Sequence, residues 1–386
     1  MAKKAYIGVN NIARKVRKSY IGVGGVARRI KKAYIGIGGV ARPCFGSGEI
    51  EYYGRITGLS VGRHKLAGAS NDNYAMFAGG VGGGTYSDLV DIYNKSLVHT
   101  TAALSEARYA LAGATLKDGG SKKYAAFAGG TLSSGAVSNK VEFFDNSATK
   151  IVSNIGLSSA RTYLAGTYMG TDAWGGVAFA GGSTNSSSNA YAVKNIDIFD
   201  KSLTSRSSMS LPTARTQLAA ASAGDYALFA GGFSVTYSDE VYFSKRTGES
   251  STNTTTQSLS VGRYRLTGGS IGDYALFAGG YEYQNGQSKV VDAYSKFLTK
   301  TTAPELSVAR EDPAVATIDG YIVFSGGTPL SDAVDIYDQS LTHIVGFNLE
   351  VARYGLAGAS VGGYALSAGG TSNNGQVTDA VEAFSI

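Results

Sequence analysis

The chain has 386 residues, with 35 Lys and Arg against 29 Asp and Glu and a net charge of +6. It contains 53 Gly, 25 Tyr and 15 Phe but a single cysteine, Cys44, which excludes an internal disulfide framework. No segment approaches the ~20 apolar residues of a membrane-spanning helix. The first residues also lack the uninterrupted apolar segment of a secretory signal.

The charge is unevenly distributed along the chain. Residues 1–48 contain 11 Lys and Arg and no acid, which leaves 24 basic and 29 acidic residues in the remainder. We therefore expect a basic N-terminal arm, residues 1–48, and a mildly acidic domain, residues 49–386. A basic arm can bind nucleic acid, but regularly spaced Tyr-Ile-Gly-Val segments do not belong to a disordered basic tail. Nucleic-acid binding is therefore not expected.

The arm repeats a 14-residue unit three times, at Lys4–Arg14, Lys18–Arg28 and Lys32–Arg42. Each unit predicts a strand, a two-residue turn of a type that tolerates positive φ, and a second strand. The expected turns are Asn10-Asn11, Gly24-Gly25 and Gly38-Gly39. Basic residues alternate with apolar ones on the second strands, which indicates a solvated face that blocks edge-to-edge pairing. The alternative is that the arm docks onto a larger assembly, because one such hairpin is marginal in water.

A longer repeat occupies the rest of the chain. The pattern Leu-x-x-(Ala or Gly)-Arg occurs seven times, and each copy is followed by a Gly-Gly pair. We call its last residues the repeat arginines: Arg63, Arg108, Arg161, Arg215, Arg263, Arg310 and Arg353. The Gly pairs begin at Gly79, Gly129, Gly181, Gly231, Gly279, Gly326 and Gly369. Their average spacing of about 48 residues is close to the ~50-residue period of kelch-type repeats.

Each repeat predicts four strands. An apolar strand such as Lys65–Ala69 follows the arginine, and the most apolar strand, such as Tyr226–Ala230, ends at the Gly pair. An alternating strand such as Val90–Tyr93 and a polar, Thr-rich strand complete the unit. Seven such units predict an all-β, seven-bladed kelch-like β-propeller. The last unit lacks its fourth strand, so we expect the N-terminal strand 50–58 to supply it and close the ring.

Charged residues recur with the same period. Six acids occupy equivalent places on the third strands: Asp91, Glu142, Asp197, Asp292, Asp335 and Glu382. The fourth repeat, Glu240–Phe243, lacks an acid at that place. Groups that recur once per blade indicate a structural role, so we interpret the repeat arginines as partners in buried ion pairs. The alternative is a converging ring of arginines that binds anions.

The sequence offers little support for a catalytic or metal site. His99 and His343 occupy equivalent places in different repeats and so should lie apart, and neither a metal site nor another cofactor is expected. The Gly-rich segment 79–84 lacks the Lys-Ser/Thr of a phosphate-binding loop. We also found no paired carboxylates that break the repeat symmetry, as a glycoside hydrolase would need. We therefore do not expect an enzyme.

The loops after the Gly pairs contain aromatic residues among Ser, Asn and Gly. This is the composition of adaptable recognition loops and of carbohydrate-stacking surfaces. The candidate binding residues are Tyr86, Tyr191, Phe233, Tyr237, Tyr281 and Tyr283. The alternative is that these side chains cover neighbouring blades. The longest loop, Ser183–Tyr191, is the best candidate for a variable contact.

Both parts of the chain resemble known families. Residues 50–386 resemble the kelch family in the Gly-Gly pair after an apolar strand and in the downstream Val-Asp-x-Tyr. They lack the tryptophan usual in the last strand, since Trp174 lies in an inserted turn. The arm is similar to the Lys-x-Tyr-Ile-Gly-Val-x-x-Val-Ala-Arg repeats that begin tail and fibre proteins of phages and prophages of Gram-positive bacteria.

The second resemblance implies an attachment module followed by an exchangeable domain. Our leading hypothesis is therefore a non-enzymatic virion protein, assembled in the cytoplasm of the bacterial host. Residues 1–48 would then bind other tail or baseplate proteins, and the chain would form a homo-oligomer, a trimer being one candidate. The propeller loops would bind a glycan or a protein on the host surface. One alternative is a structural or decoration protein without host binding, and another is a glycan-active enzyme.

Overall fold

The computed structural model describes residues 6–9, 12–15, 19–23, 26–30, 32–37, 40–46, 50–118, 121–152, 154–170, 175–203, 206–246 and 252–386. The chain divides into two compact units, residues 1–53 with 384–386 and residues 54–383. Trp174 and residues 119–120 and 171–173 lie outside the described residues. None of the helical segments in the described ranges has the length and apolarity to cross a membrane.

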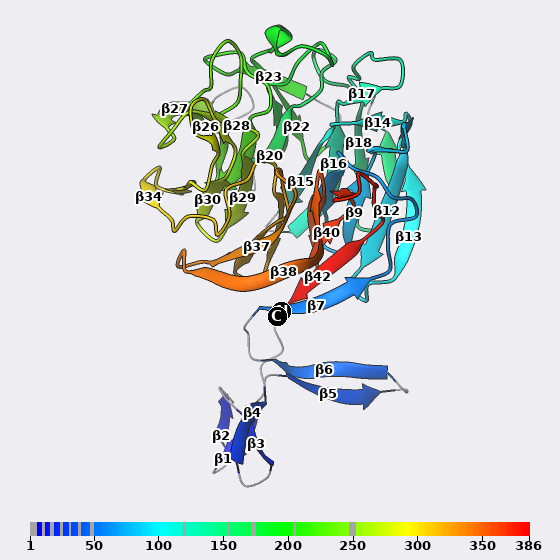
Figure 1. The fold of residues 1–386 in the computed structure, drawn as a ribbon, viewed down its shortest axis with the longest axis vertical. Helices are drawn as coiled ribbons and strands as arrows, with labels where there is room; N and C mark the ends of the chain where they lie inside the picture. The colour runs from blue at the N-terminus through cyan, green and yellow to red at the C-terminus, as the bar shows by residue number, and fades with distance from the viewer. Residues whose placement is uncertain are drawn as a thin grey trace. The chain divides into compact units, whose positions relative to one another are not determined.

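The described residues of the N-terminal arm form three antiparallel strand pairs (Figure 1). They are β1 (Tyr6–Val9) with β2 (Ile12–Lys15), β3 (Ser19–Val23) with β4 (Val26–Ile30), and β5 (Lys32–Ile37) with β6 (Val40–Gly46). The pairing repeats in register, with Ile7 opposite Arg14, Ile21 opposite Arg28 and Ile35 opposite Arg42. The 14-residue period therefore appears as a repeated hairpin register. The expected turn residues at 10–11, 24–25 and 38–39 lie outside the described residues.

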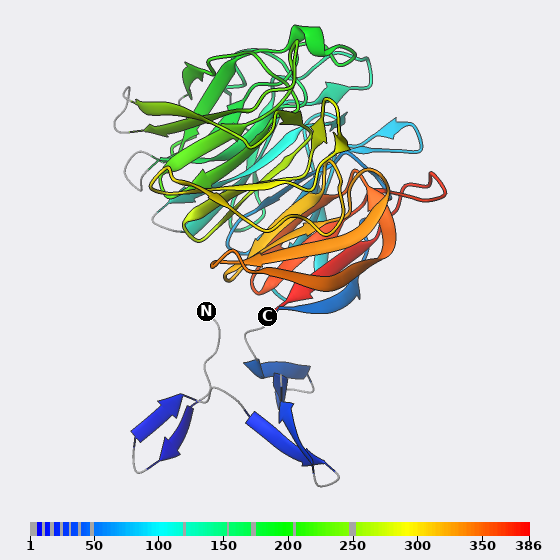
Figure 2. The same ribbon diagram turned by 60° about the vertical axis from the view of Figure 1, so that its left-hand side comes forward.

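The second unit has a propeller-like, all-β fold built from antiparallel sheets (Figure 2). Within the described ranges, six sheets have four strands and one has five, because β38 also pairs with β41. The first strands of these sheets are β8 (Ala67–Ser70), β15 (Ala112–Asp118), β20 (Ala165–Met169), β24 (Ala219–Ala223), β29 (Thr267–Ile271), β35 (Ala314–Ile318) and β39 (Ala357–Val361). The second strands are β9 (Tyr74–Ala78), β16 (Ser121–Ala128), β21 (Gly176–Ala180), β25 (Tyr226–Ala230), β30 (Tyr274–Ala278), β36 (Tyr321–Ser325) and β40 (Tyr364–Ala368).

The third and fourth strands complete each sheet. The third strands are β12 (Leu89–Asn94), β18 (Val141–Phe144), β22 (Asn195–Asp200), β26 (Glu240–Arg246), β33 (Val291–Ser295), β37 (Ser331–Asp338) and β42 (Val381–Ser385). The fourth are β13 (His99–Ala103), β19 (Lys150–Val152), β23 (Arg206–Ser210), β27 (Thr252–Ser258), β34 (Lys300–Thr302), β38 (His343–Tyr354) and β7 (Glu51–Ile56). The loops contain β10 (Val81–Gly82), β11 (Thr85–Tyr86), β14 (Arg108–Tyr109), β17 (Thr131–Leu132), β28 (Arg263–Tyr264), β31 (Tyr281–Glu282), β32 (Gly286–Gln287), β41 (Thr371–Ser372) and the 3-10 helix η1 (Asn189–Tyr191).

The first strands begin later than the sequence predicted. β8 starts at Ala67, whereas the predicted strand began two residues earlier, at Lys65; the equivalent strand β39 starts at Ala357. The reason is that Lys65 (φ 53°) and Gly355 (φ 68°) adopt the left-handed conformation, which a strand cannot contain. The prediction that Lys65–Ala69 is one strand was therefore wrong at its start.

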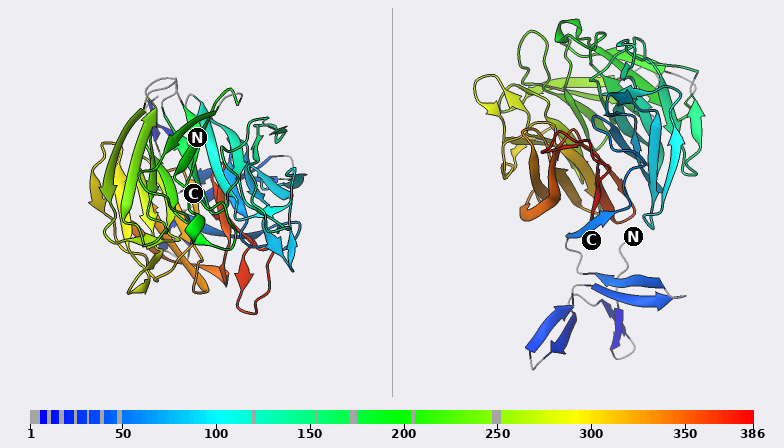
Figure 3. Two further views of the ribbon diagram at one scale, coloured as in Figure 1. Left: turned by 90° about the horizontal axis from the view of Figure 1, so that it is seen from above. Right: turned by 45° about the vertical axis from the view of Figure 1, so that its right-hand side comes forward.

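The first strands of neighbouring sheets lie against one another. β8 contacts β15, the contacts continue in chain order to β39, and β39 in turn contacts β8 (Figure 3). Glycines permit this approach, because a Cβ on Gly68 would lie 2.0 Å from the carbonyl oxygen of Gly358. A Cβ on Gly358 would lie 2.1 Å from the carbonyl oxygen of Val315. At these two positions any side chain would push the strands apart.

The two ends of the domain meet in one sheet. The strand order of that sheet is β39-β40-β42-β7, so the N-terminal strand β7 lies outermost, beside β42 (Figure 1). Just after β7, the Leu59 amide donates to the Asp379 carbonyl oxygen at 2.8 Å. The guanidinium of Arg55 also lies 2.9 Å from the Asp379 carboxylate.

Candidate functional site

The repeat arginines are buried framework residues. Each has a relative exposure of 1% or less. Each forms an ion pair with a carboxylate on the third strand of its own repeat: Arg63 with Asp91, Arg108 with Glu142, Arg161 with Asp197, Arg215 with Glu240, Arg263 with Asp292, Arg310 with Asp335 and Arg353 with Glu382. Because every guanidinium has its own partner, the seven arginines do not form a shared anion site.

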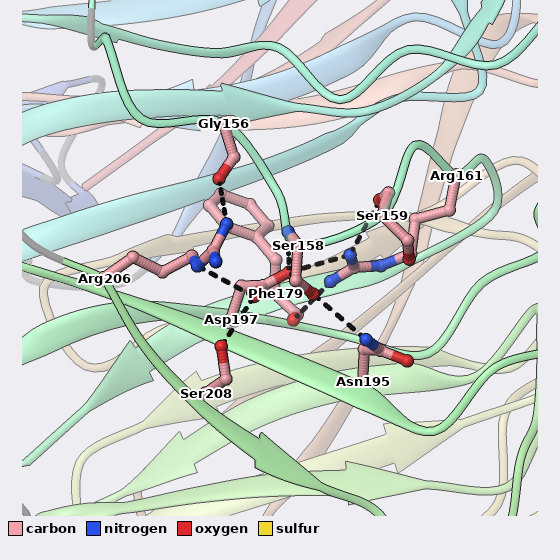
Figure 4. Close-up of polar contacts among 9 residues, drawn as sticks. All are labelled: Gly156, Ser158, Ser159, Arg161, Phe179, Asn195, Asp197, Arg206 and Ser208. Carbon is pink, nitrogen blue, oxygen red and sulfur yellow. Dashed lines mark hydrogen bonds and ion pairs between the residues drawn. The ribbon is translucent and has the colours of Figure 1, made fainter.

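Arg161 shows how such a pair fastens a sheet (Figure 4). Its Nη1 donates to Asp197 Oδ2 at 2.8 Å, and its Nη2 donates to the carbonyl oxygen of Phe179 at 3.0 Å. Asp197 Oδ2 also accepts from the amide and hydroxyl of Ser158, both at 3.0 Å. Arg206 reaches Asp197 Oδ1 from the exposed side at 3.4 Å. The segment that enters the sheet is therefore tied to its second and third strands.

In the fourth repeat the carboxylate comes from a different position on the third strand. The sequence showed no acid at the usual place, and Tyr242 does occupy it, paired with Phe229. Glu240, two residues earlier on β26, supplies the carboxylate at 2.9 Å from Arg215 Nη2. Glu240 keeps 21% of its side chain exposed, whereas the other six acids are almost fully buried. Burial lowers the pKa of Arg215 to about 10, although Glu240 opposes this shift.

Two histidines belong to the same framework. His99 Nε2 lies 2.7 Å from Asp91 Oδ1, and the imidazole stacks on Tyr93 at 4.9 Å. His343 repeats this arrangement with Asp335, again at 2.7 Å. No group of three or more His, Cys, Asp or Glu side chains that could hold a metal occurs in the described part of the chain.

Burial opposes ionisation of three of the paired aspartates, but the neighbouring cations and N–H groups outweigh it. The pKa of Asp91 is held below its usual value by Arg63 and the Ser60 amide. Arg263 with Ser260 and Arg310 with Ser307 likewise lower the pKa of Asp292 and of Asp335. These carboxylates are therefore ionised at neutral pH, which suits a structural ion pair.

The loops after the Gly pairs bring four of the six predicted aromatic residues together. Phe233, Tyr237, Tyr281 and Tyr283 gather with Tyr264 in what we call the aromatic cluster. Tyr237 is its centre, with ring centroids 5.2 Å from Tyr264, 5.4 Å from Phe233 and 5.5 Å from Tyr283. Tyr283 is 75% exposed. The cluster thus joins the loops of two consecutive sheets into one partly exposed aromatic surface.

The other two predicted residues lie elsewhere. Tyr86 packs edge-on against Tyr109 at 4.9 Å, so it covers a neighbouring repeat. Tyr191 is 56% exposed and ends η1 in the long loop. That loop is held in place, because Ser188 caps η1 and Gln217 Nε2 donates to Asn189 Oδ1 at 3.1 Å.

Sequence reasoning missed a cavity of 440 Å³ beside these loops. Its wall includes the residue two places after every repeat arginine, and we call these seven the ring residues. They are Lys65, Ala110, Tyr163, Gln217, Arg265, Asp312 and Gly355. All have positive φ, between 49° and 68°. Amide-to-carbonyl hydrogen bonds link them in succession, from the Lys65 amide donating to Gly355 O to the Asp312 amide donating to Arg265 O.

The charged side of the cavity breaks the repeat symmetry. Arg265 Nε donates to Asp312 Oδ2 at 2.6 Å, and its Nη1 lies 3.1 Å from Glu311 Oε1. Burial raises the pKa of Glu311, although Arg265 opposes this shift. Glu311 and Asp312 have no acidic equivalents at the same places in the other repeats. One guanidinium therefore holds both carboxylates at this side of the cavity.

No family model matches the chain, and no curated protein matches it. A solved structure titled "Structure of YjhT" has a similar fold, with a TM-score of 0.53 and 15% sequence identity. That similarity covers 85% of this chain and 96% of the other. At this identity the comparison supports the propeller-like fold alone, because one fold hosts many functions.

Proposed function

We propose that residues 50–386 form a closed, seven-bladed propeller that serves as the receptor-binding part of a phage virion protein. Closure is supported by a hydrogen bond that recurs in every repeat. The amide of the second glycine of each pair donates to the carbonyl oxygen of the next repeat arginine, as Gly80 does to Arg108 at 2.9 Å. The last glycine, Gly370, donates to Arg63, the first. Seven repeats joined this way leave no open inner sheet edge.

The aromatic cluster is the observation that supports binding. Framework residues in this chain recur once per repeat, whereas Phe233, Tyr237, Tyr264, Tyr281 and Tyr283 gather on two consecutive repeats. Tyr side chains supply rigid contact area with a polar end, which suits both glycan and protein surfaces. The aromatic cluster therefore makes the exposed loop surface asymmetric, and recognition of a host-surface glycan or protein requires such asymmetry.

The N-terminal arm suits attachment. We propose that residues 1–48 hold the chain on other tail or baseplate proteins, in several copies, and that the virion is its location. Three equivalent hairpins present one repeated register, from Ile7–Arg14 to Ile35–Arg42. Several weakly binding propellers on one particle gain affinity through avidity, so no single site has to bind tightly.

The test is binding of the fluorescently labelled full chain to a panel of Gram-positive bacteria. We expect Tyr283→Ala to reduce binding to the susceptible strain, because this residue is the most exposed of the cluster. The matched control is Phe297→Ala. Phe297 is 79% exposed and lies on the turn between β33 and β34. The amide of the neighbouring Lys296 donates to Asp273, just before the start of β30. The cluster residues Tyr281 and Tyr283 instead follow the end of β30. Particle association of the chain without binding to any strain would instead support the decoration role.

A further inference from the structure

The ring residues share one backbone conformation and differ in every side chain. Each has positive φ, a conformation that favours glycine, yet glycine stands at Gly355 alone among the seven. If the fold required only this backbone conformation, glycine would suit all seven positions. The six other residues hold Lys, Ala, Tyr, Gln, Arg and Asp in the wall of a cavity, so their side chains have a use beyond the turn.

The groups that line the cavity are mixed in charge and hydrogen-bonding type. Lys65 and Arg265 are donors, and Asp312, with 42% of its side chain exposed, is an acceptor. Gln217 and Tyr163 can both donate and accept. A site for a simple anion would not include Asp312, and a site for a cation would not include two basic residues. Paired donors and acceptors match the hydroxyl groups of a sugar.

The aromatic cluster adjoins the cavity wall in sequence. Tyr264 belongs to the cluster, and the next residue, Arg265, lines the cavity. Burial raises the pKa of Tyr264, and the nearby Glu311 carboxylate raises it further. A ligand could therefore stack on the cluster while its end enters the cavity.

We propose that the cavity binds the neutral terminal sugar of a host-surface glycan, with Asp312 and Gln217 contacting its hydroxyl groups. The volume of 440 Å³ lies within the ~300–1,000 Å³ of small-molecule sites and suits about one or two sugar rings. This inference rests on the proposed function for the origin of the sugar. It narrows the proposed receptor, which was either a glycan or a protein, to a glycan whose terminal sugar is bound.

The experiment is saturation-transfer NMR on the purified full chain with glucose, galactose, rhamnose, N-acetylglucosamine and their disaccharides. Glycerol phosphate serves as an anionic probe. We expect transfer to at least one neutral sugar and none to glycerol phosphate. Absence of transfer to every neutral sugar at millimolar concentration, or binding of glycerol phosphate instead, would overturn the proposal. Release of a free monosaccharide from a disaccharide would show hydrolysis, and it would overturn the proposal that the cavity binds sugar without reacting with it.

Two variants test the location. Ala110→Tyr places in the ring a side chain that the fold already accepts at Tyr163 with the same φ of 53°, so it should fold and fill the cavity. Asp312→Asn keeps a residue type that tolerates positive φ but removes the charged acceptor. We expect Ala110→Tyr to abolish transfer and Asp312→Asn to weaken binding about tenfold. Phe297→Ala should bind as wild type. Unchanged binding in both ring variants, with unchanged melting temperatures, would overturn the location.

The outcomes separate this inference from the proposed function. A chain that binds host cells but no sugar would retain the receptor-binding role and point to a protein receptor. A chain that binds a sugar but no host cell would retain the cavity site and remove the proposed role.

Discussion

The backbone amide of Gly370 donates a 2.9 Å hydrogen bond to the carbonyl oxygen of Arg63. It thus joins the last Gly pair of the chain to the first repeat arginine, and it repeats the bond that Gly80 makes to Arg108. The arginine therefore has two roles. Its side chain binds a carboxylate in its own repeat, while its carbonyl accepts from the repeat before it.

Contact between the first and last sheets can be tested by adding one methyl group. In Gly68→Ala the new Cβ would lie 2.0 Å from the Gly358 carbonyl oxygen, which a backbone atom cannot accommodate without moving β39 away. We expect a loss of ~3 kcal/mol or more in the free energy of unfolding, measured by urea denaturation. Gly363→Ala is the control, because nothing lies within 4 Å of its Cβ and its φ is not positive. Equal stability of the two variants would refute the close contact.

The buried pairs can be tested on Asp197, which binds one buried and one exposed arginine. Arg161→Ala leaves a buried carboxylate without its main partner, at a cost of about 3–5 kcal/mol. We expect the melting temperature to fall by about 5–10 °C in calorimetry. Arg206→Ala removes a pair whose arginine is 28% exposed and should lower it by ~2 °C or less. If both variants lowered the melting temperature by similar amounts, the buried arginine would stabilise the fold no more than the exposed one, which would contradict this prediction.

The architecture was largely readable from the sequence because strand burial follows apolar content. The predicted strand Tyr226–Ala230 is β25, and the residues Ala227–Ala230 in it have no exposed surface. The predicted third strand Val90–Tyr93 lies inside β12. These features depend on local composition and on a regular period, both of which are visible along the chain.

The candidate site was only partly predictable. The loop composition indicated Tyr237 and Tyr283, but Tyr264 was missed because it directly follows a repeat arginine and looked like framework. The role of Glu240 was missed because its long side chain reaches Arg215 from outside the repeated position. The ring residues were missed because a repeat position that holds seven different residue types gives no sequence pattern. The one available signal was their constant distance from the repeat arginine.

Acid should weaken the framework over a defined range. The pKa values of Asp91, Asp292 and Asp335 are lowered in the folded state, so their contribution to stability is present above the unfolded pKa of ~3.9 and is lost as the pH falls through the folded values. We expect the melting temperature to drop steeply below about pH 4. Asp335→Asn should lower it at pH 7 and make the drop between pH 4 and pH 3 smaller.

The control for that experiment lies on the same strand. Asp332 accepts from Asn348 at 3.0 Å near the surface, so Asp332→Asn should leave both the melting temperature and its acid dependence unchanged. An acid profile for Asp335→Asn that matches the wild type would contradict the assignment of the acid transition to the buried pairs.

The most direct test of the proposed receptor-binding role is competition for phage adsorption. The full chain is added to susceptible Gram-positive cells before the phage proposed to carry it, and free phage are counted over time. We expect the wild-type chain and Phe297→Ala to slow adsorption in proportion to concentration, and Tyr283→Ala to slow it far less. Adsorption that proceeds at its normal rate with saturating wild-type chain would contradict the role.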